Sequence, residues 1–107
     1  GTNASVACES SIALGQDAIA GDHHSTLANA TAIGTRAKAT GPSSIAIGEN
    51  ASALSHNSIS IGNASHATSN SIAIGHAATV PDGQNSIAIG LNSTVTGWQC
   101  FRCSYAC

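Results

Sequence analysis

Charged and aromatic residues are scarce in this chain. Lys, Arg, Asp and Glu make up 7% of its 107 residues, against about 25% in a typical soluble domain. Trp, Tyr and Phe occur once each. The formal net charge of −2 leaves no basic patch, so we expect neither nucleic acid nor an anionic membrane surface as a partner. No apolar run approaches the ~20 residues of a membrane-spanning helix, and we expect no membrane insertion.

The residue types that enzymes use for catalysis are too few or too dispersed here. The acidic residues are Glu9, Asp17, Asp22, Glu49 and Asp82. Their spacing gives no paired carboxylates for acid–base chemistry. Serine is frequent, but no G-x-S-x-G context or glycine-rich phosphate loop accompanies it. The histidines are His23, His24, His56, His66 and His76, and we expect them to be solvated turn residues. The sequence therefore predicts that the protein is not an enzyme and has no cofactor or metal site.

One five-residue pattern recurs through the chain. SIAIG occurs at Ser44–Gly48, Ser71–Gly75 and Ser86–Gly90, with the variants SIALG at Ser11–Gly15 and SISIG at Ser58–Gly62. With the closing glycine as marker, the repeats are Thr2–Gly15, Gln16–Gly34, Thr35–Gly48, Glu49–Gly62, Asn63–Gly75 and His76–Gly90. A regular internal period of this kind is typical of a solenoid and argues against disorder.

Each repeat predicts two short strands and two corners. In SIAIG the isoleucines are two residues apart, which places both on one face of a strand, and the final glycine suits a corner with positive φ. Stacked repeats align the isoleucines in ladders at ~4.8 Å per coil. We expect the isoleucines to point into the solenoid. The flat Ser/Ala face would then point outward and pack against another solenoid.

The predicted fold class is thus all-β, a parallel β-solenoid of about 14 residues per coil that packs laterally with other copies. We expect residues 1–97 to form the repeat domain. The long repeat, residues 16–34, is expected to carry a loop insertion near Gly21–His24. Residues 98–107 are expected to form a C-terminal cap or joint.

The pattern N-S-I-A-I-G-x-x-A-x-A, seen around Asn57–Gly62, Asn70–Gly75 and Asn85–Gly90, resembles the head repeats of trimeric autotransporter adhesins, the YadA-like head. The resemblance covers about Thr2 to Gly97. It implies a left-handed parallel β-roll that forms trimers. It also implies use on a cell surface as a projecting adhesive or spacer module.

N-glycosylation sequons are more frequent than chance alone suggests. They begin at Asn3, Asn29, Asn50, Asn63 and Asn92. Asn3, Asn50 and Asn92 stand two places after a closing glycine, and Asn63 joins them if its shorter coil is given a one-residue gap. We therefore expect a column of covalent N-glycans on one corner. Asn57, Asn70 and Asn85 are not sequons and are expected to form an asparagine ladder at the opposite corner.

Cys8, Cys100, Cys103 and Cys107 favour disulfides in a chain of secreted type. About six coils, or roughly 29 Å, separate Cys8 from the tail, whereas a disulfide needs Cα atoms within ~7 Å. We expect one pair within the tail and one unpaired cysteine at each end, which would join subunits head to tail. Lateral pairing between Cys8 residues is an alternative. So is a zinc site formed by the tail cysteines and a histidine.

The tail also holds all three aromatic residues, Trp98, Phe101 and Tyr105. Their spacing fits one face of a short helix. Aromatic residues would also cover the open core and unpaired edge of a last coil, and we favour this end cap.

Taken together, the sequence favours an extracellular or cell-surface structural protein. It would be a glycosylated β-solenoid subunit of a filament or surface fibre, with itself as partner and disulfide joints between subunits. The alternative is an adhesin head that binds a host or matrix ligand. A second alternative is an ice-binding solenoid, which requires a regular threonine array that the sequence lacks.

Overall fold

The I-A-I and A-x-A segments of the repeats form two parallel sheets. The computed structural model describes residues 1–7, 9–21, 29–81, 85–96 and 101–103. Arg102 and Cys103 are described by backbone alone. One sheet, here called the isoleucine sheet, contains β2 (Ile12–Leu14), β4 (Thr31–Ile33), β6 (Ile45–Ile47), β8 (Ile59–Ile61), β10 (Ile72–Ile74), β12 (Ile87–Ile89) and β13 (Phe101–Cys103). The other, the short-strand sheet, contains β1 (Ser5–Val6), β3 (Ile19–Ala20), β5 (Lys38–Ala39), β7 (Ser52–Ala53), β9 (His66–Ala67) and β11 (Thr79–Val80).

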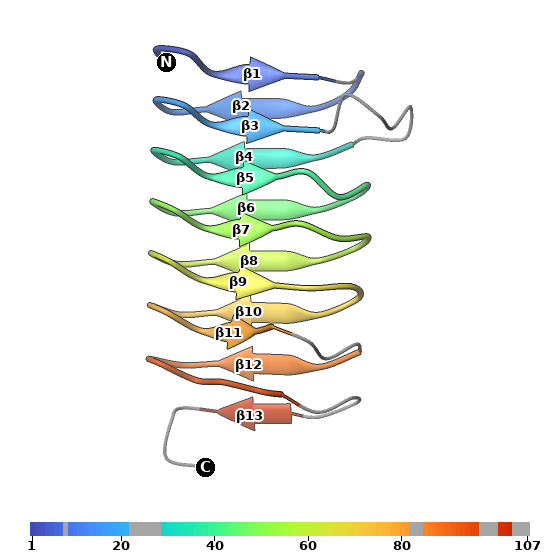
Figure 1. Ribbon diagram of the computed structural model, residues 1–107, viewed down its shortest axis with the longest axis vertical. Helices are drawn as coiled ribbons and strands as arrows, with labels where there is room; N and C mark the ends of the chain where they lie inside the picture. The colour runs from blue at the N-terminus through green and yellow to red at the C-terminus, as the bar shows by residue number, and fades with distance from the viewer. Residues whose placement is uncertain (8, 22–28, 82–84, 97–100, 104–107) are drawn as a thin grey trace.

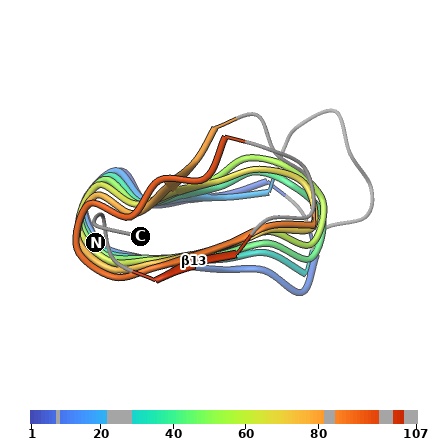
Figure 2. The same cartoon turned by 90° about the horizontal axis from the view of Figure 1, so that it is seen from below.

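The strands stack in register, one coil above the next (Figure 1). Ile72 of β10 pairs with Ile59 of β8 on one side and Ile87 of β12 on the other, and every strand pair is parallel. The molecule measures 38 × 24 × 15 Å. Seen along its long axis, each coil is a flattened loop with two facing walls (Figure 2). The predicted all-β solenoid of about 14 residues per coil is confirmed.

Both corners of the coil use the same kind of tight turn. At the corner after the closing glycine, here called the glycine corner, the Ala51 amide donates to the Gly48 carbonyl over 3.2 Å, and Asn50 has φ 60°. At the other, here called the asparagine corner, the Ser44 amide donates to Gly41 over 3.2 Å, and Ser43 has φ 57°. Positive φ at the third residue is typical of a type II turn, in which Asn is favoured there.

The positive-φ positions expose a finer period than the fourteen-residue repeat. At the glycine corner they are Asn3, Asp17, Arg36, Asn50, Ala64, Ala77 and Asn92, and at the asparagine corner Ser10, Asn29, Ser43, Asn57, Asn70 and Asn85. From Asn29 to Asn92 the successive positions are six to eight residues apart. Each coil is therefore two half-coils of about seven residues, each made of one strand and one turn.

The interior is filled with alanine and serine, so the expected orientation of the isoleucines is wrong. Ala46, the middle residue of β6, is fully buried, whereas Ile45 and Ile47 on either side remain partly exposed. The buried apolar side chains are Ala18, Ala20, Ala30, Ala32, Ala37, Ala39, Ala46, Ala51, Ala53, Ala67, Ala73, Ala78, Val80, Ala88 and Val95. The buried polar ones are Ser44, Ser58, Ser60, Ser65, Ser71, Ser86 and Ser93. The isoleucines point outward.

Coil length explains this reversal. A half-coil of seven residues spends about half of its length on the turn, so the two walls lie too close together for a ladder of isoleucines, and the largest buried side chains of the described interior are Val80 and Val95. The A-x-A segments confirm the constraint, because Lys38 between Ala37 and Ala39 is exposed while both alanines are fully buried. Small residues must therefore line both walls.

One coil replaces two interior alanines with a hydrogen-bonded pair of serines. The hydroxyls of Ser60 and Ser65 lie 2.6 Å apart across the interior, and Ser65 Oγ donates to the Gly62 carbonyl over 2.9 Å. Because the Ser65 proton is used in that bond, Ser60 donates to Ser65. The corresponding pair one coil earlier is Ala46 and Ala51. The two serines satisfy each other where neither could reach water.

The closing glycines are needed at their corner, as predicted. Gly62 has φ 130°, and a Cβ added there would lie 2.5 Å from the carbonyl oxygen of Gly75 in the next coil. A side chain at this position would be strained by its φ and would also push two coils apart.

The tail continues the solenoid by one strand. Phe101 pairs with Ile87 and Cys103 with Ile89, so β13 extends the isoleucine sheet and is not a helix. The rest of the proposed cap, residues 98–100 and 104–107, lies outside the described residues. The same holds for residues 22–28, where most of the expected loop falls.

Candidate interaction surfaces

The outer side of the isoleucine sheet is a continuous apolar surface, here called the isoleucine face. Its members are Ile12, Leu14, Ile33, Ile45, Ile47, Ile59, Ile61, Ile72, Ile74, Ile87, Ile89 and Phe101. Ile12 is 50% exposed, Leu14 55% and Phe101 63%, whereas the isoleucines between them are partly covered by their ladder neighbours. Thr31 is the one polar side chain that the described residues place in these two columns.

An apolar surface of this extent is typical of a face that packs against another molecule. We expected the Ser/Ala side to be the oligomer face, but that side is the buried interior. The correction follows directly from the reversed orientation of SIAIG. The repeated isoleucines of SIAIG were assigned to the core, but in the structure the same ladder forms the outer apolar face.

The outer side of the short-strand sheet is polar and irregular. Its main outward column consists of Ser5, Ile19, Lys38, Ser52, His66, Thr79 and Thr94. Two threonines are adjacent in this column, but the other positions differ in size and charge. The column therefore offers no regular threonine array, and ice binding gains no support from it.

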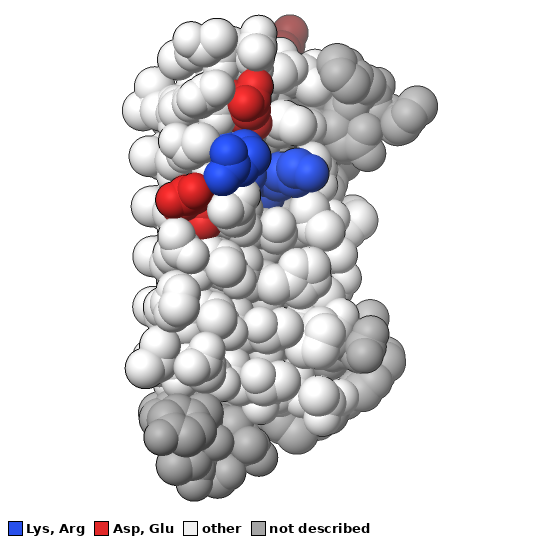
Figure 3. All heavy atoms as spheres, turned by 60° about the vertical axis from the view of Figure 1, so that its left-hand side comes forward, with Lys and Arg blue, Asp and Glu red and all other residues white. Residues whose placement is uncertain are grey.

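The charged side chains of the described residues gather near the N-terminal end of the rod. They are Glu9, Asp17, Arg36, Lys38 and Glu49. Arg102, whose backbone alone is described, lies at the other end of the rod, in β13. In Figure 3 the red and blue residues lie close together in the upper part of the molecule, and the surface below them is white. Between Asn50 and Thr96 the described part of the chain contains no Lys, Arg, Asp or Glu.

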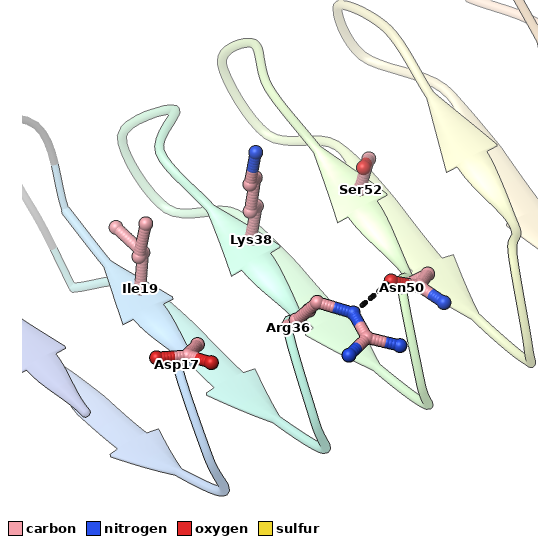
Figure 4. A pocket seen from close by; sticks show the side chains of 6 residues that line it. All are labelled: Asp17, Ile19, Arg36, Lys38, Asn50 and Ser52. Atoms are coloured by element: carbon pink, nitrogen blue, oxygen red, sulfur yellow. Dashed lines mark hydrogen bonds between the residues drawn. The ribbon is translucent and has the colours of Figure 1, made fainter. Parts of the chain in front are cut away.

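A shallow groove of about 440 Å³ lies among these charges. It is lined by Asp17, Ile19, Arg36, Lys38, Asn50 and Ser52. Figure 4 shows that these side chains come from β3, β5, β7 and the glycine corners that precede them, and that all stand on the outer side of the short-strand sheet. Residues that are 14 apart, such as Arg36 and Asn50 or Lys38 and Ser52, become neighbours because the coils stack in register.

The guanidinium of Arg36 is held in place at one side of the groove. Its Nε donates to Asn50 Oδ1 over 2.9 Å (Figure 4). Its Nη2 donates to Glu49 Oε1, also over 2.9 Å. The ion pair is about half exposed, at 52% for Arg36 and 51% for Glu49. Exposed pairs of this kind contribute under about 1 kcal/mol to stability. Their structural effect here is to fix the direction of the arginine.

The Lys38 side chain stands free in the middle of the groove. It is exposed, and it makes no hydrogen bond or ion pair within the described part of the chain. Asp17 lies on the side of the preceding coil and Ser52 on the side of the next (Figure 4). The groove thus combines one unengaged ammonium, one oriented guanidinium and one carboxylate. Sequence reasoning missed it, although the 14-residue spacing of Arg36 from Asn50 and of Lys38 from Ser52 equals one coil.

Three of the sequon asparagines share one position at the glycine corner. Asn3, Asn50 and Asn92 have φ 60°, 60° and 54° and are all exposed, as a column requires. Asn63 does not join them, because Ala64 occupies the positive-φ place and Asn63 precedes it in the turn. The Asn63 sequon also depends on Ser65, whose hydroxyl is buried. Asn29 lies at the opposite corner.

The asparagine ladder predicted for that opposite corner is present between two coils. Asn57 Nδ2 donates to Asn70 Oδ1 over 3.2 Å, and both residues have positive φ. Asn85 occupies the same turn position in the next coil, with φ 57°. These asparagines have a structural role, because they suit the turn and link successive coils.

The remaining candidate residues form no site within the described chain. Cys8, Cys100 and Cys107 lie outside the described residues, as do His23 and His24, and Cys103 is described by backbone alone. His56, His66 and His76 are at least partly exposed and belong to different columns. No group of three or more His, Cys, Asp or Glu that could hold a metal ion occurs among the described residues. Nor does this part of the chain contain a helix able to cross a membrane.

The chain matches the model of a known protein family. The model of the YadA head domain repeat, which spans two copies of the repeat, matches residues 9–26, 28–51, 39–65, 69–93 and 82–97. These matches together cover more than half of the chain. A search of curated proteins returned no significant match. The matched segments include the isoleucine strands and both corners.

Proposed function

The chain belongs to the YadA head family, and on that premise we propose that it is the adhesive head module of a cell-surface protein and that it acts as a homotrimer joined through its isoleucine face. YadA heads are surface-exposed adhesins, not enzymes, and they form trimers. The homotrimer, the exposure of the short-strand sheet to a ligand, and the cell-surface location of this chain are the parts that we propose.

The isoleucine face carries this proposal. Twelve large apolar side chains form two adjacent columns along the rod, and those at its ends are about half exposed. Burying the exposed half of an end residue is favourable by about 1 kcal/mol. The partly covered isoleucines between the ends each contribute less, so covering the whole face yields on the order of 5–10 kcal/mol per protomer. This is comparable with the estimated cost of association, about 4–15 kcal/mol. A single copy alone would leave the face exposed to water.

The arrangement divides the molecule into an inner and an outer side. With the isoleucine sheets turned toward a common axis, the short-strand sheets and their irregular polar columns face solvent. Each protomer then presents the groove around Lys38 outward. A surface that varies from coil to coil suits recognition of a ligand, whereas the uniform isoleucine face suits recognition of a second copy.

The oligomer is tested by measuring mass in solution with size-exclusion chromatography and light scattering. We expect a trimer for the native chain and a monomer for Ile61→Lys, because that lysine would lie in the centre of the apolar contact. Thr79→Lys places the same charge on the opposite sheet, and we expect it to leave the trimer intact. A monomeric native chain, or a trimeric Ile61→Lys variant, would contradict the proposed interface.

N-glycosylation is retained as part of this proposal for Asn3 and Asn92. Their exposure and shared turn position support it, because glycans at these sites would project from one corner of a surface that has little charge. Intact-mass measurement of protein from its natural source, before and after enzymatic removal of N-glycans, tests this directly. The filament with head-to-tail disulfides remains a prediction, since Cys8, Cys100 and Cys107 lie outside the described residues.

A further inference from the structure

We propose that the groove around Lys38 is a binding site for a carboxylated saccharide, such as a uronic acid unit of a surface or matrix glycan. This inference rests on the proposed function, because it names the ligand class of the head module. It is built from three observations: the position of the groove in the repeat, its charges, and its mixture of apolar and hydroxyl-bonding groups.

The groove lies where the repeat pattern is broken. The outward column of the short-strand sheet is uncharged at every described position except Lys38, with Ile19 before it and Ser52 after it. In a repeat protein the common positions maintain the stack, and the exceptions are free to serve another purpose. Asp17, Arg36 and Asn50 occupy positive-φ positions of the glycine-corner turns. Lys38 contributes neither to a turn, nor to the interior, nor to the isoleucine face, so the fold does not account for the lysine between them.

The charges in the groove select for a ligand with a single negative charge. Lys38 supplies an ammonium without a protein partner, and Arg36 is held in one direction by Asn50 and Glu49. A guanidinium that is already oriented loses little conformational entropy when a ligand binds to it. Asp17 adds a negative charge at the edge of the groove, and Glu49 neutralises Arg36 in part. These four charges sum to zero, so a densely charged ligand such as a polysulfate gains no net attraction, whereas one carboxylate can pair with Lys38.

The other lining groups fit the rest of a sugar ring. Ile19 and the aliphatic stem of Lys38 provide an apolar surface for a ring face. Asp17, Asn50 and Ser52 provide acceptors and donors for hydroxyl groups. A volume of about 440 Å³ lies toward the small end of ligand pockets, which hold roughly 300–1,000 Å³. It therefore suits one or two sugar units.

A peptide is a poorer occupant of the same groove. Extended peptides commonly bind by adding a strand to a sheet edge, where backbone groups are free. Here β3, β5 and β7 are each paired on both sides, in the order β1-β3-β5-β7-β9. The groove thus offers side chains but no free backbone edge. Binding must come from discrete contacts with a compact polar ligand.

The site and a glycan on Asn50 exclude each other. Asn50 lines the groove, and its Oδ1 is already engaged by Arg36, so an N-linked sugar on its amide nitrogen would stand at the mouth of the groove. Asn3 and Asn92 belong to other coils and do not line it. Protein made in a host without N-glycosylation is the form in which the site is open.

The test is an NMR titration of that protein with methyl glucuronide, with methyl glucoside as the neutral control and acetate as the anion control. We expect saturable shifts of the amide signals of Ile19, Lys38 and Ser52 with the glucuronide, and affinity at least about tenfold weaker for glucoside and acetate. Lys38→Ser should weaken glucuronide binding at least about tenfold, since loss of a charge-assisted hydrogen bond typically has an effect of this size.

A matched variant separates a built site from a lone lysine. Lys38→Ser combined with Thr79→Lys keeps the net charge and moves the lysine along the same column, and we expect it not to bind. Binding that follows the moved lysine, equal binding of acetate, stronger binding of an acidic peptide such as tetraglutamate, or no binding at all would overturn the inference. A native chain that fails this test but is trimeric and adheres to cells would leave the proposed function standing; one that does not adhere would contradict that function.

Discussion

A single interior alanine provides the sharpest test of the orientation of the coils. Ala46→Leu adds three carbon atoms at a position that is fully buried, with Ala32 and Ser60 as its equally buried ladder neighbours. The strand cannot bow outward easily, because its backbone is bonded to the next coil, where the Ile45 amide donates to the Ser58 carbonyl over 2.9 Å. Overpacking typically costs about 1–3 kcal/mol, and we expect the upper end, about 3 kcal/mol.

For a chain of this size 1 kcal/mol corresponds to roughly 4–8 °C in melting temperature, so Ala46→Leu should melt about 12–24 °C below the native protein. Thr31→Leu is the matched control, because it places leucine on the outer side of the same sheet. We expect it to melt at or above the native temperature. Circular dichroism at several protein concentrations measures both, since oligomerisation also raises apparent stability.

If Ala46→Leu melted with the native protein and Thr31→Leu were the damaging change, the interior would have room for large side chains. The assignment of alanine to the inside and isoleucine to the outside would then be wrong. An equal loss in both variants at every concentration would also contradict it, because only one of the two positions is enclosed.

Two further changes test individual contacts. Gly62→Ala should destabilise by at least about 2 kcal/mol, through φ strain of about 1–3 kcal/mol together with the 2.5 Å approach of its Cβ to Gly75; urea denaturation within about 0.5 kcal/mol of the native protein would refute this. Ser65→Ala should cost about 1–3 kcal/mol, because it leaves the buried Ser60 hydroxyl without its acceptor. Adding Ser60→Ala should recover most of that loss, and a double variant no more stable than Ser65→Ala would show that the pair is not coupled.

The repeat itself could be read from the sequence because its markers are local. The closing glycines occupy a corner whose φ and close packing exclude other residues, and the asparagines before SIAIG suit a turn with positive φ. Coil boundaries, strand positions and the parallel stack follow from these markers. So does the shared corner of Asn3, Asn50 and Asn92.

Hydrophobicity alone could not show which side of the SIAIG strand faces the interior. The usual expectation that the largest apolar residues fill a core assumes a core wide enough to hold them, and coil length decides that width. The relevant signal was Lys38 between Ala37 and Ala39: a lysine must point outward, so its two alanine neighbours point inward. A wall of alanine this close to SIAIG favours small side chains, chiefly Ser and Ala, on the inner side of the SIAIG strand.

The groove was missed for a different reason. Its residues are ordinary when taken singly, and only the stacking of coils makes Arg36 a neighbour of Glu49 and Asn50. For Asn63 a neighbour was predicted that does not exist. The sequence alignment placed a one-residue gap in this turn, but the turn has its usual length and Ala64 occupies the positive-φ position. In both cases one must know which residue occupies the same turn position in each coil, and the backbone φ values show this.

The half-coil of about seven residues has a consequence for how such a rod changes in length. Removing Glu49–Gly62, one whole coil, would join Gly48 to Asn63 and shorten the rod by ~4.8 Å while every later strand keeps its wall. Removing seven residues would instead send every later isoleucine strand to the opposite wall and divide the apolar face between two sides. Duplication in units of two half-coils therefore lengthens the rod by ~4.8 Å per coil while keeping the apolar face on one side.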